Sequence, residues 1–502
     1  MRLRLGCLCL LTWAAWVWGQ VTPAAKGTSN EQRTSQYLDS VRKQPSLLLA
    51  FVRDMPKGAD LHNHLSGAVY AENYIRWAAA DGLCVNRTSL AYLAPPCDSD
   101  KGSVDAQQVL ADPGLYQQVI NALSLRFFNG PDSGHDHFFN TFGKFGAVSR
   151  NHQGEMLAEV VSRAAAQHVS MLALLLSPDN GEAAGFPKKN GIAFNDDLPA
   201  LRRTMLDRGI ANVVQNARHN LDRWEMQMRE LMKCGTTQPD PGCDVVLRYQ
   251  SEMHRGLAPE QVFAELLMGF ELASQDGRVL DVNPVMPEDA YIEMRDFDLH
   301  MRMFDYLHGL YPNVKLSLHA GELWTGLVPP DGLRFHIRDS INKGHASRIG
   351  HGVDVMFEDD PVGLLKEMAA KKIAVEIKLT SNDLILGVRG DKHPLPIYMK
   401  FGVPVVISTD DEGVSRSDIT QEWLRAIKEF GLTYAQIKRM VRDSLEYSFL
   451  PGENLWSSGC GKSAKPTAAC GKTINGSERA KAQWHLEQQF AQFENKTAAL
   501  PH

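Results

Sequence analysis

Short apolar runs alternate with longer segments that carry apolar residues at helical spacing over most of this 502-residue chain. The short runs have the length of buried strands. The longer segments repeat an apolar residue every three or four positions, as a helix packed on one side does. Strand-then-helix units repeated along a chain predict a parallel sheet. The predicted strands are residues 57–64, 169–177, 245–253, 264–273, 314–322, 346–352, 373–382 and 403–411.

Eight such units predict an α/β fold in which the strands close into a (β/α)8 barrel. Residues from about 84 to 150 interrupt the alternation after the first strand and predict a helical insertion that carries cysteines. We expect a barrel domain over residues 56–455, a polar segment and helix at 20–55, and a disulfide loop and helix at 456–502. The other main helices are expected at 31–54, 197–233, 288–310, 332–344, 360–371 and 418–429.

Four phenylalanines of the insertion recur at near-helical spacing: Phe138, Phe139, Phe142 and Phe145. Such a stripe usually packs into a core, but beside a barrel mouth it can also wall a substrate pocket. Phe142 is our candidate for this second role. His135 and His137 lie in the same stretch. They are not at the end of a predicted strand and have no group of carboxylates beside them, so we expect them to belong to a lid or to the surface.

The first residues have the pattern of a secretory signal peptide. Arg2 and Arg4 precede an apolar run that stops at the small residue Gly19. A transmembrane anchor is the alternative, but the run is short for a membrane span. We therefore expect a signal peptide over residues 1–19, cleavage after Gly19, no membrane attachment afterwards, and a secreted or periplasmic protein.

Cysteine usage agrees with an oxidising compartment. Two of the eight cysteines, Cys7 and Cys9, lie in the expected signal peptide. The other six form close pairs, and an even count in close pairs behind a signal peptide predicts disulfides. No pair has the C-x-x-C spacing typical of a zinc site. The expected bridges are Cys84–Cys97, Cys234–Cys243 and Cys460–Cys470.

The composition and net charge of the chain indicate which class of molecule it binds. With 44% hydrophobic and 22% charged residues the chain is an ordinary globular protein. Its formal charge of −6 and the lack of a dense Lys/Arg stripe argue against nucleic-acid binding. A small molecule is the expected partner.

Ionisable residues gather where the predicted strands end. In a (β/α)8 barrel these carboxyl ends meet at one mouth, which is where active sites lie. Three imidazoles and one carboxylate suit Zn²⁺ with a coordination position left for water, so we assign four residues as ligands of one zinc ion per chain. These are His62, His64, His319 and Asp410.

Three further titratable residues lie at the ends of the fifth, sixth and eighth predicted strands without being needed as ligands: Glu322, His351 and Asp411. A metal with nearby groups that deprotonate a water molecule and donate a proton is the composition of a metal-assisted hydrolysis site. The sequence thus indicates a hydrolase before any likeness to a family is considered.

Four ordered segments, "DLHNHLSGA", "SLHAGE", "RIGHG" and "STDD", resemble the signature segments of the adenosine deaminase family in the amidohydrolase superfamily. "MPKG", the secretion signal, the cysteine-bearing insertion and "SFLPGE" resemble its secreted adenosine deaminase growth factor branch. The resemblance covers about residues 50–455. It implies a mononuclear zinc enzyme with the ligands assigned above. It also implies that Glu322 protonates purine N1 and that His351 and Asp411 position and activate the attacking water.

The implied reaction is hydrolytic deamination of adenosine, and of 2′-deoxyadenosine, to inosine and ammonia. The predicted fourth strand, 264–273, has no lysine that would bridge a second metal. Two alternatives stay open. One is a deaminase of another 6-aminopurine or of a modified adenine nucleoside, and the other is a secreted binding or signalling protein that kept the fold.

Departures from the family pattern concern the substrate and the assembly. Ser66 stands where most relatives carry an aspartate that meets the ribose. Ser274 is placed at the glycine whose backbone amide faces purine N3. Both are our candidate substrate-binding residues, with Phe142. The N-terminal dimerisation region of the growth factor branch is shortened here to one expected helix, so a homodimer is only one possible assembly.

Overall fold

The computed structural model describes residues 29–128, 134–460 and 467–500, so the expected signal peptide lies outside the described residues. Eight parallel strands pair in chain order, and a bridge between Asn63 and Asp410 brings the last strand back to the first. The sheet is therefore nearly closed, which confirms the predicted (β/α)8 barrel. Its strands are β1 (Gly58–His64), β5 (Val169–Leu176), β6 (Val246–His254), β7 (Val279–Val285), β8 (Lys315–Ala320), β9 (Arg348–His351), β10 (Ala374–Ile377) and β11 (Val405–Ile407).

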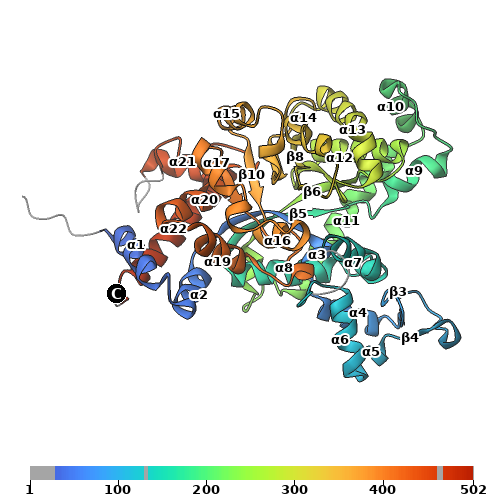
Figure 1. Cartoon of the computed structure of the whole chain (residues 1–502), viewed down its shortest axis with the longest axis horizontal. Coiled ribbons are helices and arrows are strands. Elements are labelled where there is room, and N and C mark those ends of the chain that lie inside the picture. Colours follow the sequence, from blue (N-terminus) through green and yellow to red (C-terminus); the bar gives the residue numbers. More distant parts are fainter. Residues whose placement is uncertain (1–28, 129–133, 461–466, 501–502) are drawn as a thin grey trace, which may run out of the picture.

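Helices surround this barrel and bury the outer face of its strands (Figure 1). The strand β5 is apolar on both faces, and all its residues but Ser170 are buried. The helices that follow the barrel strands are α8 (Gln153–Ala166), α9 (Glu182–Asn190), α10 (Leu198–Asp207), α11 (Ile210–Leu231), α12 (Pro259–Gln275), α13 (Tyr291–Leu310), α14 (His336–Asn342), α15 (Pro361–Lys371), α16 (Leu379–Leu386), α17 (Leu395–Phe401), α18 (Glu412–Ser415), α19 (Ile419–Phe430) and α20 (Tyr434–Glu446).

One strand prediction was wrong. Residues 264–273 lie in the helix α12, and the fourth barrel strand is β7. Every residue from Val262 to Phe270 is buried, so the middle of α12 shows no exposed polar face, and this run is apolar except for Glu265. Such a run does not distinguish a buried helix from a buried strand. β7 also contains no lysine, so the argument for a single metal is unchanged.

Two predicted helices are each broken in two. The segment 31–54 forms α1 (Asn30–Val41) and α2 (Pro45–Asp54), because Pro45 fits the first turn of a helix but not its interior. The segment 197–233 forms α10 and α11, with Gly209 between them at a φ of 91°. That left-handed conformation suits glycine and ends a helix.

The insertion after β1 holds a small antiparallel sheet that was not predicted, β3–β2–β4, beside short helices that stand out from the barrel (Figure 1). The disulfide Cys84–Cys97 ties β2 to the loop after β3. The last helix of the insertion, α7, returns to the barrel. These elements are α3 (Leu65–Ala68), α4 (Ala71–Ala80), β2 (Cys84–Asn86), β3 (Tyr92–Leu93), β4 (Ser103–Asp105), α5 (Gln107–Ala111), α6 (Pro113–Ala122) and α7 (Gly134–Ser149).

The two ends of the described chain pack together at one side of the barrel, where α1 and α2 meet α22 (Glu478–Thr497), on which α21 (Ala468–Gly476) also packs (Figure 1). Phe51 and Phe493 contact edge to face with ring centroids 5.1 Å apart. The other two expected disulfides, Cys234–Cys243 and Cys460–Cys470, are present, so all three pairings are confirmed. Among the described residues, no helix has the length and apolar character needed to cross a membrane.

Candidate active site

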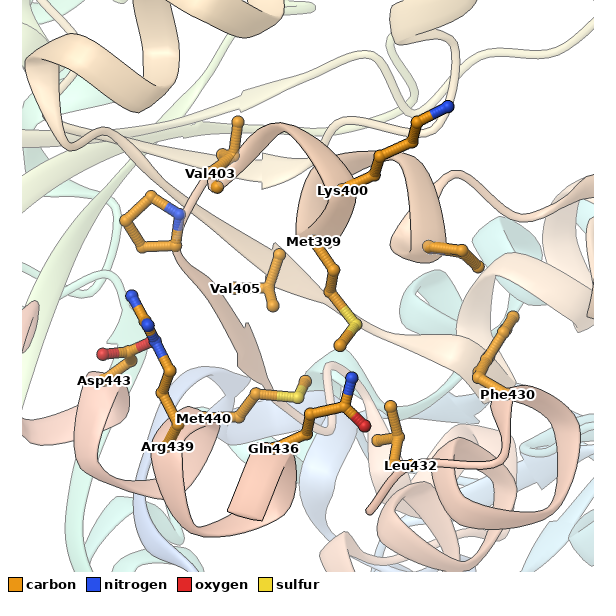
Figure 2. A pocket seen from close by; sticks show the side chains of 13 residues that line it. Met399, Lys400, Val403, Val405, Phe430, Leu432, Gln436, Arg439, Met440 and Asp443 are labelled. Atoms are coloured by element: carbon orange, nitrogen blue, oxygen red, sulfur yellow. The ribbon is translucent and has the colours of Figure 1, made fainter. Parts of the chain in front are cut away.

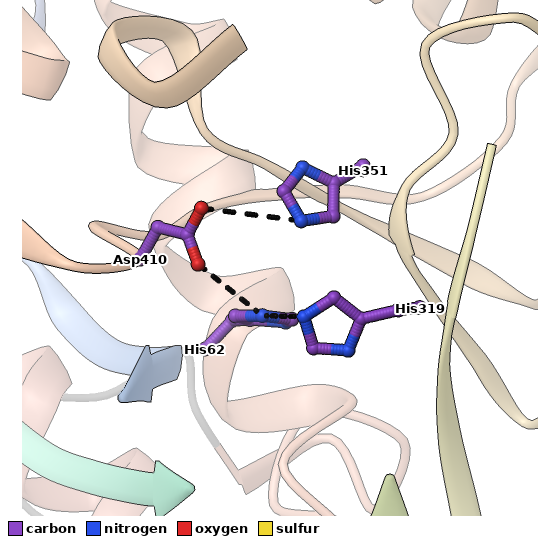
Figure 3. Close-up of side chains that lie close together, drawn as sticks. All are labelled: His62, His319, His351 and Asp410. Atoms are coloured by element: carbon purple, nitrogen blue, oxygen red, sulfur yellow. Dashed lines mark hydrogen bonds and ion pairs between the residues drawn. The ribbon is translucent and has the colours of Figure 1, made fainter. Parts of the chain in front are cut away.

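Four side chains from three strand ends converge at the C-terminal mouth of the barrel. His62 and His64 point the same way because they are two residues apart at the end of β1. The Nε2 atom of His319 lies 3.0 Å from Nε2 of His62 and 3.3 Å from Nε2 of His64. Asp410 Oδ1 lies 3.5 Å from each of the two β1 nitrogens. Figure 3 shows His62, His319 and Asp410 of this cluster facing one another.

The partners of the three Nδ1 atoms decide where the ring hydrogens are. Glu376 accepts from His62 Nδ1 at 2.6 Å, and Glu252 lies 3.1 Å from His64 Nδ1. Asn283 Oδ1 lies 2.7 Å from His319 Nδ1 and also accepts the backbone N–H of His319. All three partners are acceptors, so each Nδ1 carries the hydrogen and each Nε2 presents a lone pair.

Two Nε2 lone pairs that face one another at 3.0–3.3 Å repel unless a proton or a metal ion lies between them. Ligand atoms about 2.0–2.2 Å from a tetrahedral cation stand roughly 3.3–3.6 Å apart, which is close to the spacing found here. The three imidazoles and Asp410 therefore fit a divalent metal ion.

Charge at the cluster agrees with a cation site. Burial and the nearby Lys378 lower the pKa of His62 to about 4, so that this ring is neutral, as a ligand must be. Burial opposes protonation of His64, but Asp411, Glu252 and Asp410 outweigh it and raise its pKa to about 9. His64 thus holds a second proton when no metal is bound, and a divalent ion beside Asp410 would displace that proton.

His351 lies close to these ligands, with Nε2 3.9 Å from Asp410 Oδ2 (Figure 3), yet its hydrogen bonds differ. Its Nδ1 receives a hydrogen bond from the Nδ2 amide of Asn382 at 3.1 Å. Nδ1 is therefore the acceptor, and in the neutral ring the hydrogen is on Nε2. A nitrogen that carries hydrogen does not ligate a metal, which separates His351 from the other three histidines.

The two remaining predicted acids lie at the same mouth. Burial, and then Asp410, raise the pKa of Glu322 to about 8. Its Oε1 is 3.4 Å from His351 Nδ1. Burial also raises the pKa of Asp411, and Asp411 Oδ1 has no hydrogen-bond partner among the described residues. Glu322 can thus hold a proton near neutral pH, and Asp411 has a free oxygen.

A pocket of about 390 Å³ opens above this cluster. Phe138, Phe139 and Phe142 of α7 line it together with Val285, Met286 and Pro287, and the ionisable residues are at its base. Ser66 is also in its wall. Apolar walls above a polar base suit a flat ring that carries polar groups on one edge. None of the described residues that line the pocket is a lysine or an arginine.

Ser274 is not brought to this pocket. It lies exposed on α12, where its hydroxyl donates to the carbonyl of Glu271. The assignment depended on the mistaken strand at 264–273. His135 and His137 also stay away from the ligands. Both are on the helix α7, where His135 Nε2 contacts Asp289 at 2.9 Å and His137 contacts backbone carbonyls.

Sequence reasoning missed Glu288, which holds the turn that carries Glu322. Its two carboxylate oxygens accept the backbone N–H groups of Gly321 (3.0 Å) and Glu322 (2.8 Å), and His336 Nδ1 contacts it at 2.6 Å. Gly321 has a φ of 76°, which that turn requires. Glu288 follows β7, and the signal for it was hidden by the misplaced fourth strand.

A second pocket, of about 480 Å³, lies at the opposite, N-terminal end of β11. Met399, Met440 and Leu432 gather on its floor, and Arg439 pairs with Asp443 at its edge (Figure 2). It contains no cluster of histidines and carboxylates among the described residues. The smaller pocket at the C-terminal mouth is therefore the candidate active site.

A (β/α)8 barrel with a cluster of histidines and an aspartate at its C-terminal mouth has its candidate chemistry where barrel enzymes place their active sites. Residues 287–455 match the family model described as adenosine deaminase, which confirms the resemblance to this family over that part of the chain.

Curated relatives agree over shorter stretches. An adenosine deaminase from Vibrio atlanticus is 31% identical over 147 residues, which are 29% of this chain and 41% of that protein. An adenine deaminase from Rhizobium leguminosarum is 31% identical over 192 residues, or 38% and 50%. The chain thus spans half or less of the length of these relatives.

Solved structures share the fold. A zinc-bound amidohydrolase from Burkholderia ambifaria has a TM-score of 0.54 at 15% identity, over 89% of this chain and 95% of that one. The N6-mAMP deaminase of Arabidopsis has a TM-score of 0.52 at 17% identity, over 80% and 96%. At these identities the likeness establishes the barrel and its surrounding helices alone.

Proposed function

We propose that this chain is a secreted or periplasmic, zinc-dependent hydrolytic deaminase that converts adenosine and 2′-deoxyadenosine to inosine and ammonia. One observation carries the proposal. Three Nε2 lone pairs and Asp410 converge on one point, next to a buried Glu322 that retains its proton. A zinc ion held by His62, His64, His319 and Asp410 would lower the pKa of a water molecule toward 7.

The other residues then have separate roles. A bound zinc ion would favour the ionised form of Asp411, whose pKa burial otherwise raises, and Asp411 then accepts a proton from the attacking water. His351 directs its Nε2–H at the attacking oxygen. Glu322 gives its proton to purine N1, which makes C6 electrophilic. The C6–O bond forms, the C6–N bond breaks, and the amino group leaves as ammonia with the proton that Asp411 held. The proton of the new C6 hydroxyl passes to Glu322 as C6 becomes a carbonyl, so both residues return to their starting forms.

The pocket favours a neutral substrate. Its phenylalanine wall suits the faces of a purine, and the Ser66 hydroxyl is available to a ribose. A 5′-phosphate would enter a pocket that holds carboxylates and no lysine or arginine among its described lining residues, and like charges there disfavour binding. A nucleoside is therefore expected to bind better than a nucleotide. The three disulfides support the proposed oxidising compartment.

A substrate panel tests this proposal. Release of the 6-amine is measured with adenosine, 2′-deoxyadenosine, adenine, N6-methyladenosine and AMP, each at the same concentrations; this amine is ammonia except with N6-methyladenosine, which gives methylamine. We expect the two nucleosides to have the highest kcat/KM and AMP to be poorer by ~10-fold or more, since burying an unpaired charge beside carboxylates is costly. A clear preference for AMP would overturn the nucleoside assignment. Release from none of the five would overturn the proposed activity.

A further inference from the structure

A chain of hydrogen bonds leads from the backbone to His351. The N–H of Leu395 donates to His393 Nδ1 at 3.1 Å, so the ring hydrogen of His393 is on Nε2, which donates to Asn382 Oδ1 at 3.1 Å. This bond fixes the orientation of the amide, and Asn382 Nδ2 then donates to His351 Nδ1 at 3.1 Å. The hydrogen of neutral His351 is thereby placed on Nε2, on the side of Asp410.

Burial makes this chain a fixed arrangement. Asn382 is 0%, His351 1% and His393 2% exposed, so bulk water does not replace any of the bonds. Burial, and then Arg425, lower the pKa of His393 to about 3, which keeps His393 neutral with one donor and one acceptor nitrogen. A neutral ring that accepts from the backbone on Nδ1 has only Nε2 left to donate.

The nearby histidines have the opposite arrangement. His62, His64 and His319 each place their Nδ1 against an acceptor, which leaves Nε2 free of hydrogen. Asn283 and Asn382 show the contrast most directly. Asn283 presents its oxygen to His319 Nδ1, whereas Asn382 presents its nitrogen to His351 Nδ1.

We propose that Asn382 and His393 are positioning residues that hold His351 as an Nε2–H donor, so that His351 orients the attacking oxygen and does not take its proton. This inference rests on the proposed deaminase function. The proton that the water loses goes to Asp411, whose Oδ1 is unpaired. His351 in this form has no lone pair on Nε2 and is excluded from both the metal and the role of general base.

Neutron diffraction from deuterium-exchanged, zinc-loaded crystals tests the proposal without any activity assay. We expect a deuteron on Nε2 of His351 and on Nδ1 of His62, His64 and His319. A neutral His351 ring with its deuteron on Nδ1 would overturn the inference. The result is independent of the substrate panel, so failure of the proposed function and failure of this inference are distinguishable.

Substitutions test the consequence for turnover. Asn382→Asp replaces the donor by an acceptor, so the His351 hydrogen moves to Nδ1. We expect kcat to fall by about 10²–10⁴-fold, the usual contribution of a group that handles the reacting proton or its oxygen, with zinc retained and KM changed less. Asn283→Asp is the matched control. Replacing this amide by a carboxylate keeps an oxygen at His319 Nδ1, so the His319 deuteron should stay on Nδ1. Near-normal kcat in Asn382→Asp with the deuteron moved would contradict the proposal.

His393 offers a second route if Asn382→Asp does not fold. His393→Gln retains an amide that can donate to Asn382 Oδ1, whereas His393→Phe has a similar volume and no donor. The phenylalanine variant should lose at least ~10-fold in kcat, by the usual cost of losing a positioning contact to a catalytic ring, and the glutamine variant clearly less. Equal losses in both folded variants would mean that His393 only fills space, which would overturn its positioning role.

Discussion

At the scale of single residues, the Nδ1 partner of each histidine decides what its ring can do at the mouth of the barrel. Glu376 is itself held by Arg348 Nε at 2.5 Å and Ser317 Oγ at 2.8 Å. Burial opposes ionisation of Glu376, but Arg348 and then His62 outweigh it and hold its pKa well below the usual range. A carboxylate that stays ionised keeps the hydrogen of His62 on Nδ1 and its lone pair on the metal side.

Two substitutions distinguish the proposed role of His319 as a metal ligand from that of Glu322 as a proton donor. His319→Ala removes one of four converging ligand atoms, so metal and activity should be lost together. Glu322→Gln removes only the proton donor, so the variant should retain its metal and fold while kcat falls by about 10²–10⁴-fold. Elemental analysis and ammonia release on both variants check this. Loss of zinc from Glu322→Gln would make Glu322 a ligand and would contradict the assignment of Asp410.

At the scale of elements, an ion pair holds the helix α7 in place at the pocket. His135 of α7 contacts Asp289, which precedes α13, at 2.9 Å, and also contacts Asp136 at 2.9 Å. Burial opposes protonation, but Asp289 and then Asp136 outweigh it and raise the pKa of His135 to about 9; Glu322 adds to this. The pair joins the phenylalanine wall to the loop after β7 on the other side of the pocket.

The ion pair between His135 and Asp289 predicts a pH dependence of substrate binding. Because its pKa is raised from 6.5 to about 9, His135 is fully paired below about pH 6.5, and the pair is lost as pH rises through about 9. KM should therefore rise above about pH 9. Asp289→Asn keeps an oxygen near His135 but removes the charge, so the rise should move to lower pH. Identical KM profiles for the wild type and the variant would contradict the role of the pair.

The elements also show what the sequence can and cannot predict. Seven of the eight barrel strands were found because each is a short apolar run between helical segments, and the clustering of His62, His64, His319 and Asp410 could be predicted because these residues end those strands. The helix α12 was mistaken for a strand because its middle, from Val262 to Phe270, is buried on every side. Ser274 was therefore misplaced and Glu288 overlooked. The antiparallel sheet of the insertion was not predicted from the sequence because its strands have only two or three residues.

At the scale of the whole molecule, closure of the barrel brings together residues that lie more than 300 positions apart in the chain, such as His62 and Glu376. No local pattern contains this information, but the strand-end rule for (β/α)8 barrels supplies it. The bridge of Asn63 to Asp410 is part of the closure and places a ligand directly beside β1. The hydrogen-bond chain through His393 required the three-dimensional structure, because nothing in the sequence sets the orientation of an amide.

The central claim is that one metal ion at this mouth makes the chain a deaminase, and a titration tests it most directly. The protein is stripped with a chelator, zinc is added in known fractions of an equivalent, and ammonia release from adenosine is recorded at each addition. We predict no activity without metal, a linear rise, and a plateau at one zinc ion per chain, because the four converging ligand atoms fill one site. Full activity in the stripped protein, or a plateau at two equivalents, would contradict the account.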